Sequence, residues 1–239
     1  MVYIIGAGPG DPELITVKGQ RLLKEADVII YAGSLVNPAL LDYAKADCEI
    51  YNSASMTLGE VIETITAAEQ EGKMTVRLHT GDPAIYGAIQ EQMDELSRRN
   101  IEYTVIPGVS SFLATAAALK QEYTLPEISQ TVIITRNEGR TPVPEKEKLK
   151  SLAAHQATMC IFLSVHMISE VVEQLIEGGY EPSTPIAIVQ KASWPEQKIV
   201  RGTLETIADI VKCLDTEYAK SRLYAPEFSH MYRQGTDKA

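Results

Sequence analysis

The stretch VYIIGAGPGDP, residues 2–12, decides the fold of this chain. Its first four residues are apolar and predict a buried β-strand, and the alternate glycines Gly6, Gly8 and Gly10 predict a sharp turn directly after it. In open α/β sheets, ligands bind beyond the carboxyl ends of the strands. The turn is therefore a candidate floor for a ligand site.

This turn departs from the dinucleotide-binding fingerprint, which has a small residue at its last position, where this chain has Asp11. A second strand is expected over residues 27–31, and Ala32-Gly33-Ser34 follows it in place of the acidic residue that would bind a ribose. Both differences disfavour NAD. They leave a phosphate or nucleotide contact and a plain tight turn as alternatives.

The composition limits the partners of the protein. With 239 residues, of which 45% are hydrophobic, the chain can form one large or two small domains with well-buried cores. Its net charge of −10 disfavours nucleic acid, because phosphate binding requires a basic surface. An anionic small molecule can still bind through a local basic cluster.

The same survey predicts a cytoplasmic protein. No apolar run is long enough to span a bilayer, and the chain starts directly with a strand rather than with a basic leader, so no membrane partner is expected. Cys48, Cys160 and Cys213 are odd in number and far apart, which is typical of a reducing compartment. Neither the cysteines nor the four histidines have a metal-ligand spacing, so we expect no protein-bound metal.

Two further predicted strands, residues 74–78 and 103–106, also end in glycine turns, HTGDPAIYG (79–87) and PGVSS (107–111). After the first of these turns a helix is expected from about residue 88 to residue 99. Repeated strand–turn–helix units predict an α/β domain with a mainly parallel sheet over residues 1–118. After a linker at 120–127, residues 119–239 are expected to form a second α/β domain with a mixed sheet. Its strands are expected at residues 131–135, 158–163, 185–190 and 198–201.

The order of the motifs resembles the tetrapyrrole (corrin/porphyrin) methyltransferases that use S-adenosylmethionine. GAGPGDP, YAGSLV, TGDPAIYG, PGVSS, IFLSVHM and PIAIVQKAS follow one another at matching distances over nearly the whole chain. The resemblance implies two domains with S-adenosylmethionine in the cleft between them, a tetrapyrrole substrate and a homodimer. YAGSLV and the closing LYAPEFSHMYR are most similar to the members that methylate C-11 of precorrin-4 or of its cobalt form.

The resemblance also leaves alternatives within this chemistry. Members that methylate uroporphyrinogen carry Asp-Arg where this chain has Ala32-Gly33, so that carboxylate cannot be carried over and no catalytic base is assigned. Another methylation of the same pathway, on precorrin-2 or precorrin-3B, stays open. So does a non-catalytic module that binds the cofactor.

Position by position, the resemblance implies a set of cofactor contacts, most of them made through the backbone. These are Pro9, Gly81, Asp82, Ile85, Ser110, Ser111, Ser164 or Val165, and Ala192. Asp82 is the sharpest candidate, although an Asp before a proline can equally serve as a local turn cap.

The substrate would need basic partners, because a corrin precursor carries many carboxylates and arginine binds carboxylates in a bidentate way. Arg136 and Arg140 lie in one polar loop, and Arg222 and Arg233 lie in the C-terminal tail. Tyr86 is a candidate for the wall of the substrate site. The alternatives are a solvated loop and tail for the arginines and a half-buried core position for Tyr86.

Overall fold

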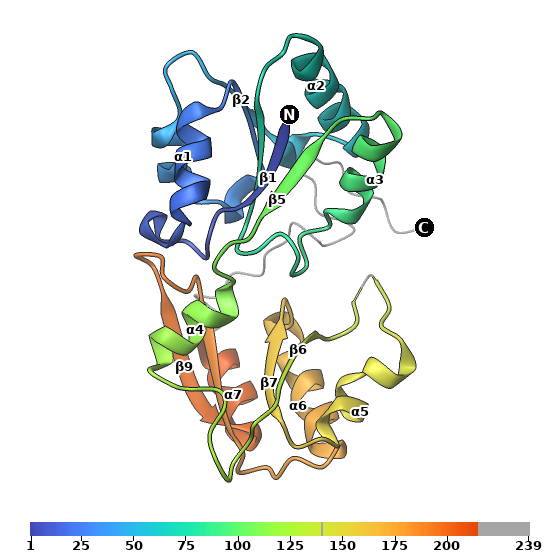
Figure 1. Cartoon of the computed structure of the whole chain (residues 1–239). Helices are drawn as coiled ribbons and strands as arrows, with labels where there is room; N and C mark the ends of the chain where they lie inside the picture. The colour runs from blue at the N-terminus through green and yellow to red at the C-terminus, as the bar shows by residue number, and fades with distance from the viewer. Residues whose placement is uncertain (140, 215–239) are drawn as a thin grey trace. The chain divides into compact units, whose positions relative to one another are not determined.

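The computed structural model describes residues 1–139 and 141–214, and the chain divides into two compact units (Figure 1). The first unit comprises residues 1–115 together with 191–196, and the described part of the second comprises 116–139, 141–190 and 197–214. Residues 120–127, which were expected to link two domains, fall within the second unit. A domain boundary between residues 118 and 119 stays a prediction.

The first unit is built on a five-stranded sheet in which every neighbouring pair is parallel. The strand order is β3-β2-β4-β1-β5, so β1 lies between β4 and β5. The predicted parallel α/β sheet is therefore confirmed. The strands are β1 (Val2–Gly6), β2 (Val28–Tyr31), β3 (Glu49–Asn52), β4 (Thr75–His79) and β5 (Tyr103–Ile106).

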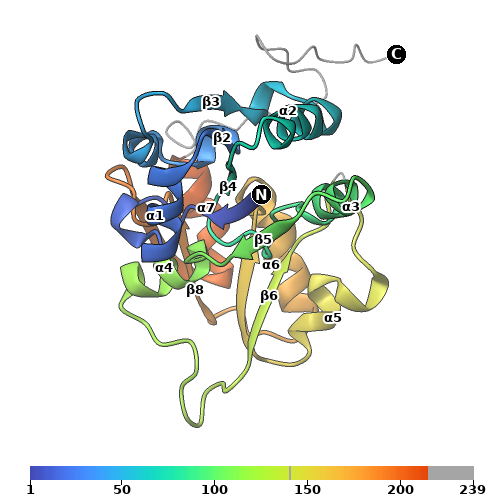
Figure 2. The ribbon, with the colours of Figure 1, turned by 45° about the horizontal axis from the view of Figure 1, so that its top comes forward.

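Helices cover both faces of this sheet. Figures 1 and 2 show α1 (Val17–Glu25) on one side and α2 (Leu58–Gln70) and α3 (Gln90–Arg98) on the other. Because side chains alternate along a strand, Val76 and Leu78 of β4 join the core under α1. A second core, under α2 and α3, holds the apolar residues Val2, Val28, Ile30, Val61, Ile62, Ile65, Ala68, Leu96 and Ile101.

Side-chain caps fix where these helices begin. Thr16 Oγ1 accepts a hydrogen bond from Gly19 N at the start of α1. Thr57 and Glu60 form a reciprocal capping box at the start of α2. α3 begins at Gln90, two residues later than the sequence pattern predicts, because Ala88 has φ +50 and a residue with that backbone conformation cannot belong to an α-helix.

Short 3₁₀ helices fill the connections of the first unit. Pro38 starts the longest of them, Pro38–Tyr43. The others are Pro12–Leu14, Gly33–Leu35 and Ser53–Ser55.

The second unit contains both parallel and antiparallel strand pairs, as a mixed sheet would. β6 (Val132–Arg136) pairs with β7 (Thr158–Phe162) in parallel, and β8 (Pro185–Gln190) pairs with β9 (Lys198–Thr203) in antiparallel orientation. Within the described residues these are two separate two-stranded sheets. The helices are α4 (Ser111–Leu119), which crosses the division between the units, α5 (Leu149–Ala153), α6 (Ile168–Glu177) and α7 (Leu204–Leu214), with 3₁₀ turns at Glu145–Glu147 and Val165–Met167.

Apolar faces of the helices form the core of this unit. Leu149 and Ala153 of α5 pack with Val171 and Leu175 of α6, and Ile207 of α7 packs in a neighbouring cluster with Val200 of β9. In the part of the chain that the structure describes, no helix has the length and apolarity to cross a membrane.

Candidate functional site

Three glycine turns meet at the carboxyl edge of the first unit's sheet. They follow β1, β4 and β5, which are neighbours in the sheet. Gly8 N donates to Gly81 O at 3.2 Å, and Gly81 N donates to Gly8 O at 2.8 Å, so the turns after β1 and β4 are joined by a pair of backbone hydrogen bonds. Both glycines have positive φ, which explains the residue type.

The backbone of the turn after β5 is in direct contact with the backbones of the turns after β1 and β4. A Cβ on Gly108 would lie against the carbonyl oxygen of Gly81 and 2.7 Å from Gly6 Cα. A Cβ on Gly6 would lie 2.6 Å from Gly108 Cα. The missing side chains thus allow three strand ends to approach backbone to backbone.

Asp82 links two of these turns through both of its carboxylate oxygens. Oδ1 accepts from Ala84 N at 2.8 Å, and Oδ2 accepts from Gly108 N at 2.9 Å. The local turn cap considered from the sequence therefore exists, and the same side chain also fixes the PGVSS turn. Asp82 is half-buried in this arrangement.

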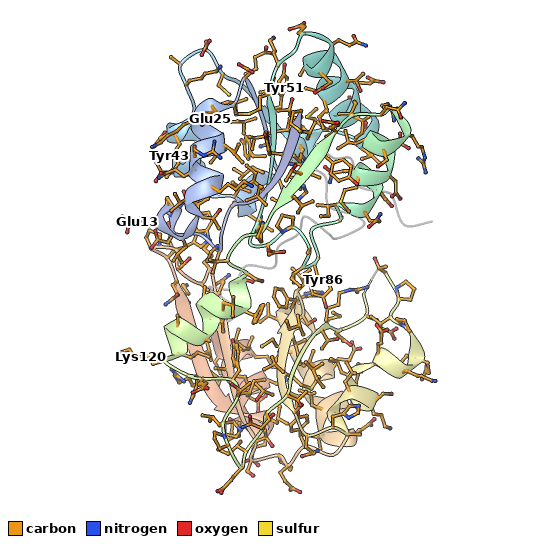
Figure 3. All side chains as sticks on the ribbon, viewed as in Figure 1. Glu13, Glu25, Tyr43, Tyr51, Tyr86 and Lys120 are labelled. Atoms are coloured by element: carbon orange, nitrogen blue, oxygen red, sulfur yellow. The ribbon has the colours of Figure 1, made fainter. Side chains whose placement is uncertain are left out.

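After Asp82, the chain passes through an unusual backbone conformation at Tyr86 and Ala88. Tyr86 has φ +55 and Ala88 has φ +50, a region that non-glycine residues rarely adopt. Tyr86 is exposed and lies on the loop that follows β4 (Figure 3), so a half-buried core position for it is wrong. Ile85 is half-buried.

A segment from much later in the chain completes this edge of the first unit. Residues 191–196, KASWPE, belong to the first unit. Trp194 Nε1 donates to Pro9 O at 2.9 Å, and Ser193 Oγ accepts from Asp11 N at 3.0 Å. Ala192, which precedes Ser193 in the sequence, is buried. Two predicted cofactor contacts, Pro9 and Ala192, are thus held in one small region.

Ser110 and Ser111 lie where the turn after β5 becomes α4. Ser110 is buried, and its carbonyl oxygen accepts from Leu113 N and Ala114 N in the first turn of the helix. Seven of the predicted cofactor contacts therefore belong to the first unit, on turns that follow strands or on the segment 191–196. They are Pro9, Gly81, Asp82, Ile85, Ser110, Ser111 and Ala192.

Ser164 and Val165 belong to the second unit, in the turn after β7. Ser164 is buried, its Oγ donates to Phe162 O at 2.7 Å, and the same oxygen accepts from Asn137 N at 2.9 Å. Asn137 in turn contacts Glu170 and Gln174 of α6. The Ser164 hydroxyl thus joins the turns after β6 and β7, and a contact of either residue with a cofactor stays a prediction.

The predicted substrate arginines are only partly described. The Arg136 guanidinium donates to the carbonyl oxygens of Asn137, Thr141 and Pro142, at 3.3, 3.1 and 3.4 Å, and so braces its own loop. Arg140, Arg222 and Arg233 lie outside the described residues. The role of these arginines toward a substrate stays a prediction.

Arg77 and His79, the buried polar residues at the end of β4, lie next to the turn that follows this strand. Burial, together with the nearby positive charge of Arg77, lowers the pKa of His79 to about 3, so this imidazole is neutral. Burial also lowers the pKa of Arg77 to about 10, which leaves the guanidinium charged at neutral pH. Within the described residues no group of three or more potential metal ligands gathers.

Sequence reasoning missed Trp194, Asn137, Arg77 and Gln92 as contributors to these turns. Trp194 carried a usable signal, because it is the only tryptophan of the chain and stands two residues after Ala192. Asn137 directly follows a strand, a position that also deserved a prediction. Arg77 and Gln92 gave no local signal, since nothing in the pattern indicates that they are buried.

Comparison with known proteins agrees with this geometry. Residues 1–208 match the family of tetrapyrrole (corrin/porphyrin) methylases. The cobalt-precorrin-4 C(11)-methyltransferase of Methanocaldococcus jannaschii is 59% identical over 99% of this chain and 97% of its own length.

Two solved structures extend the comparison. The X-ray structure of a cobalt-precorrin-4 methyltransferase of cobalamin biosynthesis has a TM-score of 0.87, with 50% identity over 89% of each chain. The uroporphyrin-III C-methyltransferase of Thermus thermophilus, solved with S-adenosylhomocysteine, has a TM-score of 0.73, with 29% identity over 87% of this chain and 85% of its own. With its parallel sheet, its glycine turns and a match over residues 1–208, this chain belongs to the tetrapyrrole methylase family.

Proposed function

We propose that this protein transfers a methyl group from S-adenosylmethionine to C-11 of cobalt-precorrin-4, a step of cobalamin biosynthesis. The observation that carries the proposal is the 59% identity, over nearly the full length of both chains, to a cobalt-precorrin-4 C(11)-methyltransferase. The solved cobalt-precorrin-4 methyltransferase, at 50% identity, supports the same substrate. Any cobalt is part of the substrate.

The turns of the first unit fit S-adenosylmethionine. The relative solved with S-adenosylhomocysteine shares this fold. Gly81 packs against the backbone of the PGVSS turn, since a Cβ added to it would lie 3.6 Å from Ser110 Cα and 3.7 Å from Ser111 N, so the predicted contacts Gly81, Ser110 and Ser111 lie together. The Asp82 carboxylate and the Ser110 and Ser111 hydroxyls suit the hydroxyl and amino groups of an adenosyl amino acid. We assign cofactor binding to these residues with Pro9, Ile85 and Ala192, and with Ser164 or Val165 of the second unit.

When bound, S-adenosylmethionine supplies a methyl group on a sulfonium ion, and the sulfur keeps the electron pair of the bond that breaks as the ring carbon forms its new bond. The protein supplies alignment and a water-poor surface for this in-line displacement. The paired turns at Gly8 and Gly81 and the Asp82 bridge provide a rigid floor for that alignment. Arg136 and Arg140 would bind substrate carboxylates, and Tyr86 would contact the tetrapyrrole.

The proposal extends to the compartment, the oligomeric state and the metal requirement of the enzyme. We propose a cytoplasmic homodimer that needs no metal ion bound by the protein. Three free cysteines, odd in number, support a reducing compartment. Light scattering on the purified protein tests the dimer.

Calorimetric titration with S-adenosylhomocysteine, with NAD as the control ligand, tests the donor. Binding of the first without the second supports the proposal. Incubation with S-adenosylmethionine and cobalt-precorrin-4, or metal-free precorrin-4, followed by mass spectrometry, then tests the acceptor. Methylation of precorrin-2 or precorrin-3B instead would replace the proposed substrate. Binding of S-adenosylhomocysteine without turnover of any precursor would indicate a cofactor-binding module, and binding of NAD alone would overturn the donor.

A further inference from the structure

Arg77, His79 and Gln92 form a buried polar cluster next to the TGDPAIYG turn. Burying these polar side chains destabilises the folded state, and the fold alone does not require it. Arg77 on β4 and Gln92 on α3 are 6% and 7% exposed, and they lie within the core between the sheet and α3. Arg77 Nη1 donates to Ile30 O at 3.0 Å, and Nε donates to Gln92 Oε1 at 3.0 Å. Among the described residues no carboxylate pairs with this guanidinium. A buried cation with only neutral partners is costly.

The charge of Arg77 determines how the Gln92 amide is oriented. A guanidinium has donors and no acceptor, so the amide oxygen of Gln92 must face it. The amide nitrogen must therefore point the other way, and it donates to Ala88 O at 3.2 Å. Gln92 thus receives one hydrogen bond from the strand and gives one to the last residue of the turn.

Ala88 is a residue whose conformation needs external support. Its φ is +50, Tyr86 has φ +55, and a Cβ on Gly87 between them would collide with the backbone carbonyl of Pro83. Backbone conformations of this kind are strained for a residue other than glycine and persist where the surroundings fix them. The Gln92 hydrogen bond to Ala88 is such a constraint.

We propose that Gln92, oriented by Arg77, is a positioning residue that holds the turn 81–88 in the shape required to bind S-adenosylmethionine. The inference rests on the proposed function, because it concerns the same turn that carries Gly81, Asp82 and Ile85. Gln92 acts through Ala88 and makes no contact with the methyl donor itself.

The variant Gln92→Glu separates positioning from a purely structural role. Glutamate has nearly the same shape and accepts from Arg77 as an ion pair, but an ionised carboxylate cannot donate to Ala88 O. The matched control is Gln90→Glu, the same substitution two residues away on α3. Gln90 is exposed, and its side-chain amide donates to Asp94 Oδ1 at 2.8 Å on the same helix.

Two measurements are made on wild type, Gln92→Glu and Gln90→Glu. The first is the Kd for S-adenosylhomocysteine by calorimetry, which should rise about five- to tenfold in Gln92→Glu, the effect of one lost hydrogen bond. The second is amide hydrogen exchange in the ligand-free protein. It should become faster over residues 84–89 in Gln92→Glu, with β1 and β5 unchanged. Gln90→Glu should match the wild type in both.

The outcomes separate this inference from the proposed function. If wild type does not bind S-adenosylhomocysteine, the proposed function fails and the inference fails with it. If wild type binds and Gln92→Glu binds equally well, only the positioning role of Gln92 is overturned. Exchange that accelerates evenly over the whole first unit would also overturn it, because that result indicates a loss of overall stability.

Discussion

The indole nitrogen of Trp194 donates a hydrogen bond to the carbonyl oxygen of Pro9 at 2.9 Å, across 185 residues of sequence. The indole ring also occupies the place where a Cβ of Gly10 would lie, so glycine is required there. Ser193 Oγ adds a second bond by accepting from Asp11 N. The turn after β1 is thus held from outside by the segment 191–196, which connects β8 to β9.

This contact gives the protein an internal probe. Trp194 is the only tryptophan, and it bonds to a predicted cofactor contact, so its fluorescence should change saturably as S-adenosylhomocysteine is added. In Trp194→Phe the ring is kept in part and the hydrogen bond is lost. We expect the calorimetric Kd to rise about fivefold, equivalent to about 1 kcal/mol. Tyr51→Phe serves as the control, because it removes the hydrogen bond that the Tyr51 hydroxyl donates to Glu49 elsewhere in the unit. An unchanged Kd in Trp194→Phe would contradict the prediction.

Asp82→Asn should weaken both stability and ligand binding. The two carboxylate oxygens of Asp82 accept from Ala84 N and Gly108 N, whereas an asparagine has only one oxygen and turns an NH₂ group toward the other donor. We expect a loss of about 1–3 kcal/mol in the free energy of unfolding, measured with urea. The Kd for S-adenosylhomocysteine should rise as the turns after β4 and β5 separate.

Asp11→Asn is the matched control for this change. Asp11 also caps a turn at the same edge of the sheet, and within the described residues its carboxylate accepts through Oδ1 alone, from Glu13 N at 2.9 Å. An asparagine oxygen can replace that single acceptor. Equal losses of stability in the two variants would show that the double bridge of Asp82 has no special weight.

Local signals in the sequence predicted the three glycine turns and their common edge of the sheet. Glycines at Gly6, Gly8, Gly81 and Gly108 follow apolar strands, and both the turns and their common edge follow from the rule that parallel strands end on one side of a sheet. The return of residues 191–196 to the first unit was not predictable from pattern, because it depends on one long-range fit between Trp194 and the glycine turn.

The remaining differences have the same physical origin. The helical pattern from residue 88 is interrupted because Ala88 is held in a left-handed conformation by Gln92, a contact that propensity does not contain. The Ser164 hydroxyl bridges Phe162 and Asn137, a role the pattern does not show, and its contact with a cofactor stays a prediction. In both places a side-chain hydrogen bond fixes the local structure, and the sequence pattern does not show which partner that side chain selects.

His79 should make the first unit less stable as the pH falls. Burial, with Arg77 nearby, lowers its pKa to about 3, while an unfolded histidine titrates near 6.5. Below about pH 6.5 the unfolded chain binds a proton that the folded chain refuses, so this group's contribution to stability is complete above that pH and is lost toward pH 3. From about pH 7 to pH 5 the loss due to His79 is about 2 kcal/mol.

Urea unfolding followed by Trp194 fluorescence measures this effect within the first unit. His79→Gln, which cannot titrate in this range, should lose about 2 kcal/mol less than wild type between about pH 7 and pH 5. His155→Gln changes an exposed histidine and should follow the wild-type pH dependence. If His79→Gln and wild type lose stability in parallel, His79 is accessible to protons in the folded protein.

Gly108→Ala adds one methyl group and should destabilise the first unit more than the same change at most other glycines. The new Cβ would collide with the carbonyl oxygen of Gly81 and with Gly6 Cα, and both are backbone atoms that cannot rotate away. Relief requires the turn after β5 to move from β1 and β4, so we expect a loss of about 1–3 kcal/mol in unfolding free energy and a weaker Asp82–Gly108 bond. Gly139→Ala, with no atom within 4 Å of the added Cβ, should stay within about 0.5 kcal/mol of wild type. Trp194 bonds to the turn after β1, so its emission should change if the packing of the three turns is disturbed. Unaltered stability and emission in Gly108→Ala would mean that the three strand ends are not in contact in solution.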